Sequence, residues 1–127
     1  VLRPLMETGV ITPNTAVVVD AKSGVSGAGR KPTPRTHFSE VTENFSAYSV
    51  LEHRHVPEIL MNSGIGEGRL SFTAQLIPID RGILETIYFQ AEKVATPLEL
   101  FDVYRRRYSR EPFVGLYEPG KVPDVRS

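Results

Sequence analysis

The chain has 127 residues, 40% of them apolar, and its 15 basic side chains balance its 15 acidic ones, so no net charge attracts nucleic acid or an anionic membrane surface. It contains no cysteine, which excludes disulfide bonds and thiolate chemistry within the chain. No apolar run approaches the roughly 18 residues of a membrane span and no signal peptide is recognisable, so we expect a cytoplasmic protein without nucleic-acid or membrane partners.

The N-terminal half predicts a strand that leads into a glycine-rich loop. Residues 15–20 form a short apolar run rich in valine, which is typical of a buried strand. Residues 22–30 follow and contain three glycines. Pro32 and Pro34 then exclude an early helix, because each proline removes a backbone donor and restricts the residue before it. The acidic segment 36–45 predicts a short helix further on.

The next segment predicts a helix followed by two strands. Residues 58–62 have the composition of a short helix, and the glycines of 64–68 end it. Apolar and polar residues alternate along 70–77 and again along 83–91, which predicts two strands. Residues 78–82 are interpreted as a connection between adjacent strands.

A longer helix and a last short strand are expected near the C-terminus, over 97–107 with Thr96 as its N-cap and over 113–117. This order of elements predicts an α+β fold in which helices cover one face of a mixed or largely antiparallel sheet. We expect a single domain over residues 1–127. The start at Val1, in mid-element and without an initiator methionine, suggests a segment excised from a longer protein.

Two histidines flank an arginine at His53, Arg54 and His55, directly before a predicted helix. An imidazole titrates near neutral pH, so either histidine is a candidate general acid or base, and Arg54 is a candidate anion contact. The pair is also compatible with a metal site completed by His37 or Glu58, or with a structural or merely exposed role. The residues alone leave these alternatives open.

The loop between Lys22 and Arg30 is a candidate phosphate site, because successive backbone N–H groups between two cations can cradle an anion. Its spacing matches neither a Walker loop nor the Gly-x-Gly-x-x-Gly of a dinucleotide fold, so an ordinary flexible loop is the alternative. Arg81 either reaches the same site from a strand end or forms a turn ion pair with Asp80. The arginines at 105–107 indicate either an anion contact or a solvated helix end.

Four blocks of the sequence resemble N-acetyl-gamma-glutamyl-phosphate reductase of arginine biosynthesis, in that family's order. They are residues 20–32, residues 38–41 with Tyr48, residues 53–59 and residues 78–83. The resemblance is to the family's second domain, which is similar to the C-terminal domain of glyceraldehyde-3-phosphate dehydrogenase. It implies an α+β substrate-binding and dimerisation domain, assembled as a homodimer or homotetramer, whose nucleotide-binding domain and cysteine nucleophile lie outside this chain.

The resemblance further implies an NADPH-dependent oxidoreductase that reduces an acyl phosphate to N-acetyl-glutamate semialdehyde through a thioester. NADP would be bound mainly by the absent nucleotide domain, and no metal is implied. Without the cysteine, the isolated chain should be inactive. The implied site residues are His55 and His53 as general acid and base, Arg54, Arg81, Lys22 and Arg30 as substrate contacts, and Ser26 and Gly27 as cofactor contacts.

Two other interpretations of the same blocks stay open. A relative that acts on the one-carbon-longer aminoadipyl phosphate of lysine biosynthesis would share them. A non-catalytic oligomerisation or binding module could also keep this fold after losing its nucleotide-binding half. The gene sequence on either side of the segment would separate the enzyme from the module.

Overall fold

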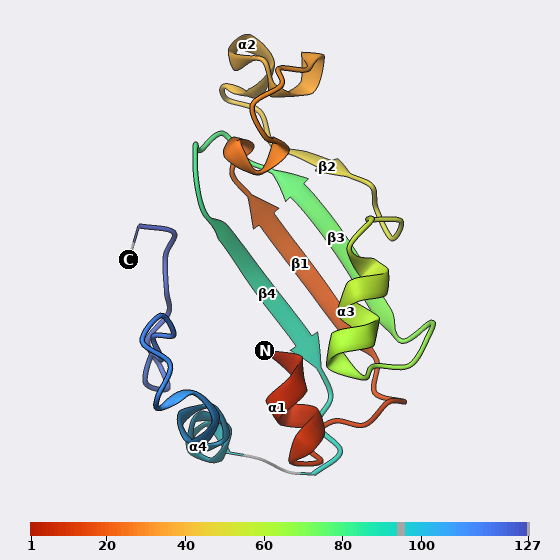
Figure 1. Ribbon diagram of the computed structural model, residues 1–127, viewed down its shortest axis with the longest axis vertical. Coiled ribbons are helices and arrows are strands. Elements are labelled where there is room, and N and C mark those ends of the chain that lie inside the picture. The colour runs from red at the N-terminus through yellow and green to blue at the C-terminus, as the bar shows by residue number, and fades with distance from the viewer. Residues whose placement is uncertain (94–95, 127) are drawn as a thin grey trace. The chain divides into compact units, whose positions relative to one another are not determined.

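The computed structural model describes residues 1–93 and 96–126 (Figure 1). Helices and strands alternate irregularly along the chain, which confirms the α+β class. The elements are α1 (Leu2–Glu7), β1 (Val17–Ser23), the 3-10 turns η1 (Val25–Ala28) and η2 (Pro34–Thr36), α2 (Phe38–Val41), β2 (Ser46–Tyr48), α3 (Val56–Ser63), β3 (Leu70–Leu76), β4 (Ile83–Phe89) and α4 (Pro97–Tyr108).

Contacts within the chain are concentrated in two compact units. The first comprises the described residues of 1–17, 57–70 and 89–123, and therefore holds α1, most of α3, and α4. The second comprises those of 18–56, 71–88 and 124–127, and holds nearly all of the sheet with the loops between its strands. The expectation that helices cover one face of the sheet stays a prediction.

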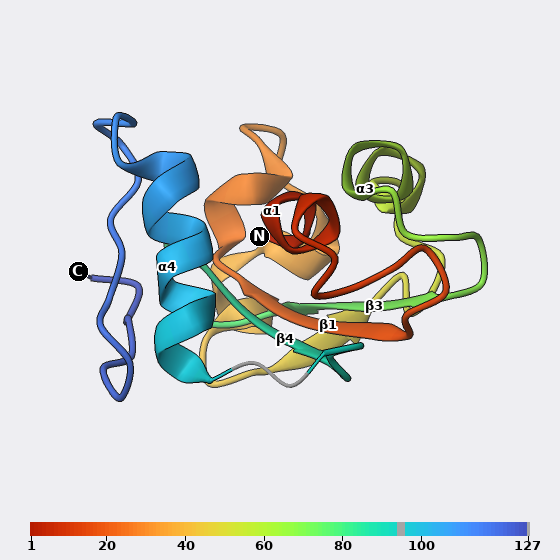
Figure 2. The ribbon, with the colours of Figure 1, turned by 90° about the horizontal axis from the view of Figure 1, so that it is seen from below.

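The described residues form a four-stranded sheet in the order β2-β3-β1-β4. Strands β2 and β3 are antiparallel, with Ser46 opposite Leu76 and Tyr48 opposite Ala74. Figure 1 shows β1 and β3 pointing the same way and β4 the opposite way, and Figure 2 shows these three strands as one layer. The sheet is therefore mixed, which is one of the two arrangements that the strand pattern predicts.

The interpretation of residues 78–82 as a connection between adjacent strands is wrong. Strand β1 lies between β3 and β4, so this segment crosses the carboxyl end of β1. There the backbone N–H of Gly24 donates to the carbonyl of Gly82 at 2.9 Å, and the N–H of Val25 donates to the carbonyl of Ile79 at 2.9 Å. Alternation identifies a strand but not its neighbour, because any partner with a matching buried face satisfies it.

The two faces of the sheet differ in burial. Val19 and Ala21 of β1 are 3% and 4% exposed, and Phe72 and Ala74 of β3 are 7% and 3% exposed. Val18, on the opposite face of β1, is 45% exposed. Since side chains alternate across a strand, this period of two fixes one apolar face and one more polar face.

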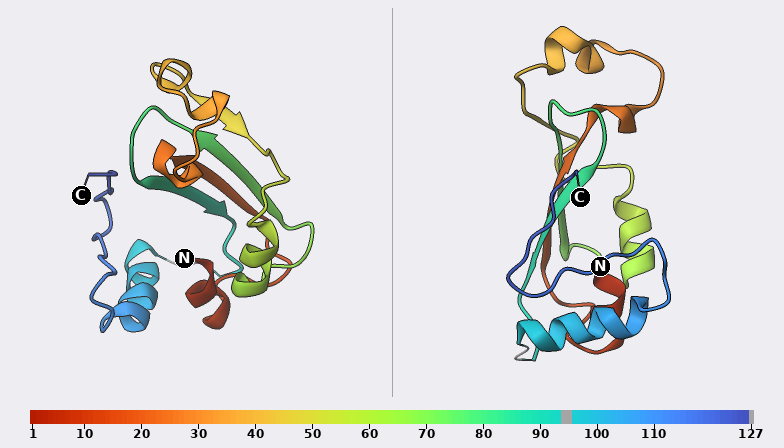
Figure 3. Two further views of the ribbon diagram at one scale, coloured as in Figure 1. Left: turned by 45° about the horizontal axis from the view of Figure 1, so that its top comes forward. Right: turned by 90° about the vertical axis from the view of Figure 1, so that its left-hand side faces the viewer.

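The predicted helix over 36–45 is shorter than expected. Two brief helical pieces, η2 and α2, interrupt an excursion between β1 and β2, and the chain becomes extended again at Ser46. Figure 3 shows this excursion projecting beyond the end of the sheet. Pro34 stands at the first position of η2, where a missing N–H costs nothing, and the extended backbone of His37 separates η2 from α2.

Helix α4 confirms its predicted start. The Thr96 side chain accepts a hydrogen bond from the Glu99 N–H at 3.3 Å, and the Glu99 carboxylate accepts one from the Thr96 N–H at 2.7 Å. This reciprocal cap satisfies two of the free donors at the helix start.

The C-terminal end of α4 carries the arginine run. Arg105 pairs with Asp102 at 2.9 Å and Arg107 lies 4.0 Å from Glu7 of α1, so the arginine run is a solvated helix end with ordinary ion pairs.

The strand expected over 113–117 does not form. Phe113 lies in a turn and is 99% exposed, and the residues from Val114 to Glu118 belong to no strand or helix. Apolar and aromatic residues favour a strand only where a neighbouring strand supplies hydrogen bonds and a surface to pack on. None of the described helices is long and apolar enough to cross a membrane.

The close contact at Gly24 gives a stability prediction. A Cβ at this position would lie 2.9 Å from the Asp80 carbonyl oxygen and 3.0 Å from the Arg81 nitrogen. Gly24→Ala should therefore lower the free energy of unfolding by about 1–3 kcal/mol in urea titrations. Gly27→Ala is the matched control, because its Cβ would meet only Ser23 Oγ at 3.4 Å. Equal stability of the two variants would contradict this packing.

Candidate functional site

The histidine segment is held beside the sheet by a strained turn. After β2, Ser49 and Leu51 adopt φ values of 45° and 60°, in the left-handed region that side-chain-bearing residues avoid at a cost of about 1–2 kcal/mol. The Leu51 N–H donates to the Phe72 carbonyl of β3 at 3.1 Å, which ties the turn to the sheet. Backbone strain of this kind is concentrated at functional sites, where the surrounding structure maintains it.

His53 is fixed on the apolar face of the sheet. Its ring centroid lies 5.2 Å from that of Phe72 and 5.6 Å from that of Tyr48. Its Nδ1 accepts a hydrogen bond from the His55 backbone N–H at 3.3 Å. An accepting Nδ1 carries no proton, so the neutral His53 ring holds its proton on Nε2.

His55 lies edge-on to His53, with ring centroids 4.9 Å apart. Burial lowers the pKa of His53 below its ordinary value of 6.5, and the charges of His55 and Arg54 lower it further. His53 is therefore mainly neutral at pH 7. Protonating it costs more in the folded chain than in the unfolded one, so its contribution to stability is present above pH 6.5 and is lost as the pH falls through the lowered pKa.

Both histidines open into a cleft of about 520 Å³ in the second unit. Its floor is the apolar face of β1 and β3, and its walls come from the glycine-rich loop, the excursion after it, the histidine turn and the start of β4. The lining residues are Ala21, Ser23, Gly24, Gly27, Ala28, Thr33, Arg35, Thr36, Tyr48, Ser49, Glu52, His53, Arg54, His55, Phe72, Ala74, Leu76, Ile83 and Glu85.

Of the predicted site residues, His53, Arg54, His55 and Gly27 line this cleft. The other predicted site residues do not line it. Lys22 projects from the opposite face of β1 and pairs with Asp20. Arg81 pairs with Asp80 at 3.5 Å with 86% of its side chain exposed, which is the turn ion pair considered above. Ser26 and Arg30 also lie outside the cleft lining.

The glycine-rich loop is not a free backbone cradle. The N–H groups of Gly24, Val25 and Ser26 donate to the carbonyls of residues 82, 79 and 80, each at 2.9 Å. The N–H of Gly29 donates to the Ser26 carbonyl at 3.1 Å. An anion at this loop would therefore have to be held mainly by side chains, and the loop's chief contribution to the cleft is the open space beside Gly27.

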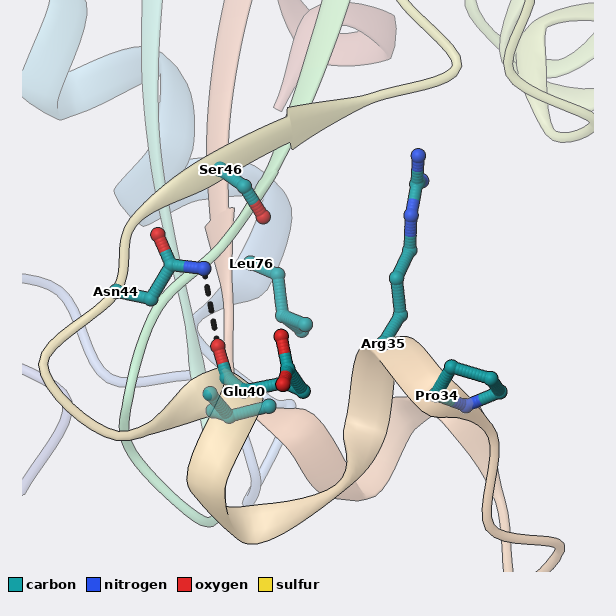
Figure 4. Close-up of a pocket in the computed structure, with 7 residues that line it drawn as sticks. Pro34, Arg35, Glu40, Asn44, Ser46 and Leu76 are labelled. Atoms are coloured by element: carbon teal, nitrogen blue, oxygen red, sulfur yellow. Dashed lines mark hydrogen bonds between the residues drawn. The ribbon is translucent and has the colours of Figure 1, made fainter.

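Sequence reasoning missed several cleft residues, of which Arg35 is the most informative. Arg35 belongs to the one-turn η2, and nothing in its neighbourhood of prolines and threonines distinguishes it from an exposed loop cation. It also lines a second, smaller cleft of about 180 Å³ (Figure 4), with Pro34, Glu40, Val41, Asn44, Ser46 and Leu76. Glu52 and Glu85 of the larger cleft were also missed, because isolated carboxylates carry no spacing signal.

The described residues do not supply the ligands that the metal-site alternative needs. His37 is exposed, and its Nδ1 lies 2.9 Å from Ser39 Oγ. Within residues 1–93 and 96–126, no three histidine, aspartate or glutamate side chains are grouped as metal ligands.

Comparison with known proteins identifies the family. The model of the family described as "Semialdehyde dehydrogenase, dimerisation domain" matches residues 1–127. N-acetyl-gamma-glutamyl-phosphate reductase from Desulforudis audaxviator is 46% identical over 99% of this chain and 37% of its own length. The proteins of that name from Geobacillus stearothermophilus and Halalkalibacterium halodurans are 44% and 42% identical, each over 98% of this chain and 37% of their own length. The chain thus spans little more than a third of these relatives, and it belongs to the semialdehyde dehydrogenase dimerisation domain family.

Proposed function

We propose that this chain is the substrate-binding and subunit-contact part of an N-acetyl-gamma-glutamyl-phosphate reductase that works in the cytoplasm in arginine biosynthesis. The reaction is the NADPH-dependent reduction of the acyl phosphate to the semialdehyde. The observation that carries the proposal is the pair of histidines beside Arg54 in one cleft, in a chain whose relatives bear this name. The thiol nucleophile and the dinucleotide-binding loop come from other parts of the full-length protein.

His55 is the better candidate for the proton-transferring group. Its ring has no hydrogen-bond partner among the described residues, so both nitrogens are available to substrate, whereas Nδ1 of His53 is occupied by a backbone N–H. The neutral His53 beside it keeps its own proton on Nε2. In the proposed reaction, His55 takes the proton of the thiol as the sulfur attacks the acyl carbon and phosphate leaves. It then gives this proton to the thiohemiacetal oxygen that forms on hydride transfer, and takes it back as the aldehyde forms and the thiolate leaves.

NADPH, when bound, supplies the hydride that reduces the acyl group. The residues of this chain would contact only a small part of that cofactor. Gly27 and Ala28 leave one wall of the cleft free of bulky side chains, and a Cβ on Gly27 would have only one neighbour at ordinary contact distance. We infer that this wall faces the cofactor, while the rest of the protein binds most of it.

The exposed sheet face favours assembly of the proposed enzyme as a homodimer or homotetramer. Val18, the second residue of β1, is 45% exposed, and β1 has a neighbouring strand on either side. An exposed apolar side chain on an inner strand of a sheet is a suitable contact for the same face of a second copy related by a twofold axis. The family description, which names dimerisation, supports this inference.

Replacing the histidines in the full-length protein tests the catalytic proposal. His55→Asn should lower kcat for the acyl phosphate by about 100-fold or more, because the general acid and base is lost. His53→Asn should lower it less. Arg105→Ala, at the solvated end of α4, is the control and should leave kcat unchanged. The isolated chain should show no activity. Near wild-type rates for both histidine variants between about pH 6 and 9 would contradict the proposal.

Titration of the imidazole signals by NMR tests the electrostatics of the pair. His53 should titrate below pH 6.5, mainly because of burial and partly because of the charge of His55. His55→Asn removes that charge, so the pKa of His53 should rise but stay below 6.5. An unchanged pKa for His53 in this variant would show that the charge of His55 does not reach it, and a lower pKa would contradict the sign of the effect.

Sedimentation of a sheet-face variant tests the assembly. Val18→Glu should shift the full-length protein toward monomers, because a carboxylate would be buried against its symmetry mate. Met61→Glu, at a 75% exposed position of α3, is the matched control and should keep the wild-type assembly. Unchanged assembly of the Val18 variant would place the subunit contact elsewhere.

A further inference from the structure

We propose that Arg35 is the principal anion-binding residue of the larger cleft, and that it takes a carboxylate or phosphate oxyanion of the substrate. The inference rests on the proposed function for the identity of that substrate. It moves the principal anion contact away from Lys22, Arg30 and Arg81, which do not line the cleft, Lys22 and Arg81 being ion-paired outside it. Arg54 is the second arginine of the lining.

The guanidinium of Arg35 is available to a ligand. Arg35 lines both clefts, and Figure 4 shows its side chain extended away from Glu40. Among the described residues no hydrogen bond or ion pair holds it. Its planar donors therefore remain free for the two-point contact that arginine makes with carboxylates and phosphates.

The backbone on both sides of Arg35 is fixed by a threonine clasp. The Thr33 N–H donates to Thr36 Oγ1 at 2.9 Å, the two hydroxyls lie 3.0 Å apart, and the Thr36 N–H donates to the Thr33 carbonyl at 3.0 Å. Pro34 further restricts this turn. The turn buries no side chain, so hydrogen bonds rather than apolar packing hold it in place. A rigid base lowers the entropy lost when an arginine binds a ligand.

The carboxylates of the cleft orient the anion. Glu52 and Glu85 also line it, but neither forms an ion pair with Arg35 or Arg54 among the described residues. Their negative charges would repel an oxyanion from their part of the lining. The arrangement favours an anion against Arg35, on the side of the excursion, with the reacting carbon toward His55.

Equilibrium binding to the full-length protein tests the anion site without needing catalysis. Inorganic phosphate and N-acetylglutamate are titrated separately into wild-type protein and into Arg35→Gln, Arg35→Lys and Lys31→Gln. Arg35→Gln should raise the Kd of one of the two probes by at least about tenfold, since a charge-assisted hydrogen bond is lost. Arg35→Lys should give a smaller increase, because it keeps the charge but not the planar fork.

Lys31→Gln removes a nearby cation outside the cleft lining and should leave both Kd values unchanged. A rise for phosphate alone assigns Arg35 to the phosphate, and a rise for N-acetylglutamate alone assigns it to the carboxylate. Unchanged affinity for both probes in Arg35→Gln, with the thermal unfolding of the wild type, would overturn the inference.

Kinetics in the reverse direction separate this inference from the proposed function. The semialdehyde, phosphate and NADP⁺ are converted to the acyl phosphate and NADPH, and Arg35→Gln should raise the KM of the same oxyanion partner with little change in kcat. A wild-type protein that does not catalyse this reaction would refute the proposed function, while the binding titrations would still decide the role of Arg35. A lowered kcat with unchanged KM would refute the binding role.

Discussion

The crossing of residues 78–82 over the carboxyl end of β1 is the constraint on which the second unit depends. Gly24 must lack a side chain there, because the backbone of Asp80 and Arg81 occupies the space that a Cβ would need. The same crossing places β1 between β3 and β4 and engages the N–H groups of the glycine-rich loop. One close backbone contact therefore determines both the strand order and what the loop can offer a ligand.

The histidine pair depends on that sheet. Phe72 and Tyr48 provide the aromatic surface against which His53 packs, and the strained turn at Ser49 and Leu51 directs the chain toward it. The result is a histidine that is held neutral beside one that is exposed and whose ring has no hydrogen bond to the described residues. Two imidazoles of different environment are a suitable arrangement for moving a proton, because the pair resists taking up a second charge.

The sequence predicted the positions of helices and strands better than it predicted which strands lie side by side. The alternation along Leu70–Leu76 and Ile83–Phe89 and the cap at Thr96 are local signals, and the structure confirms all three. Strand order depends on contacts between residues far apart in the sequence, so the local pattern could not show that residues 78–82 cross over β1. The expected strand over 113–117 failed for a related reason, since propensity cannot supply a hydrogen-bonded neighbour.

The same difference between local and long-range signals holds for the candidate site. His53, Arg54 and His55 are adjacent in sequence, so their common place in the cleft was predictable. Lys22 was misplaced because its face of β1 depends on the strand register, and Arg35 was missed because only the folded excursion brings it to the cleft.

The most direct test of the account is a crystal structure of the full-length protein with N-acetylglutamate bound. We predict the ligand in the cleft of about 520 Å³, with a carboxylate on Arg35 or Arg54 and its far end near His55. A ligand bound away from these residues would contradict it.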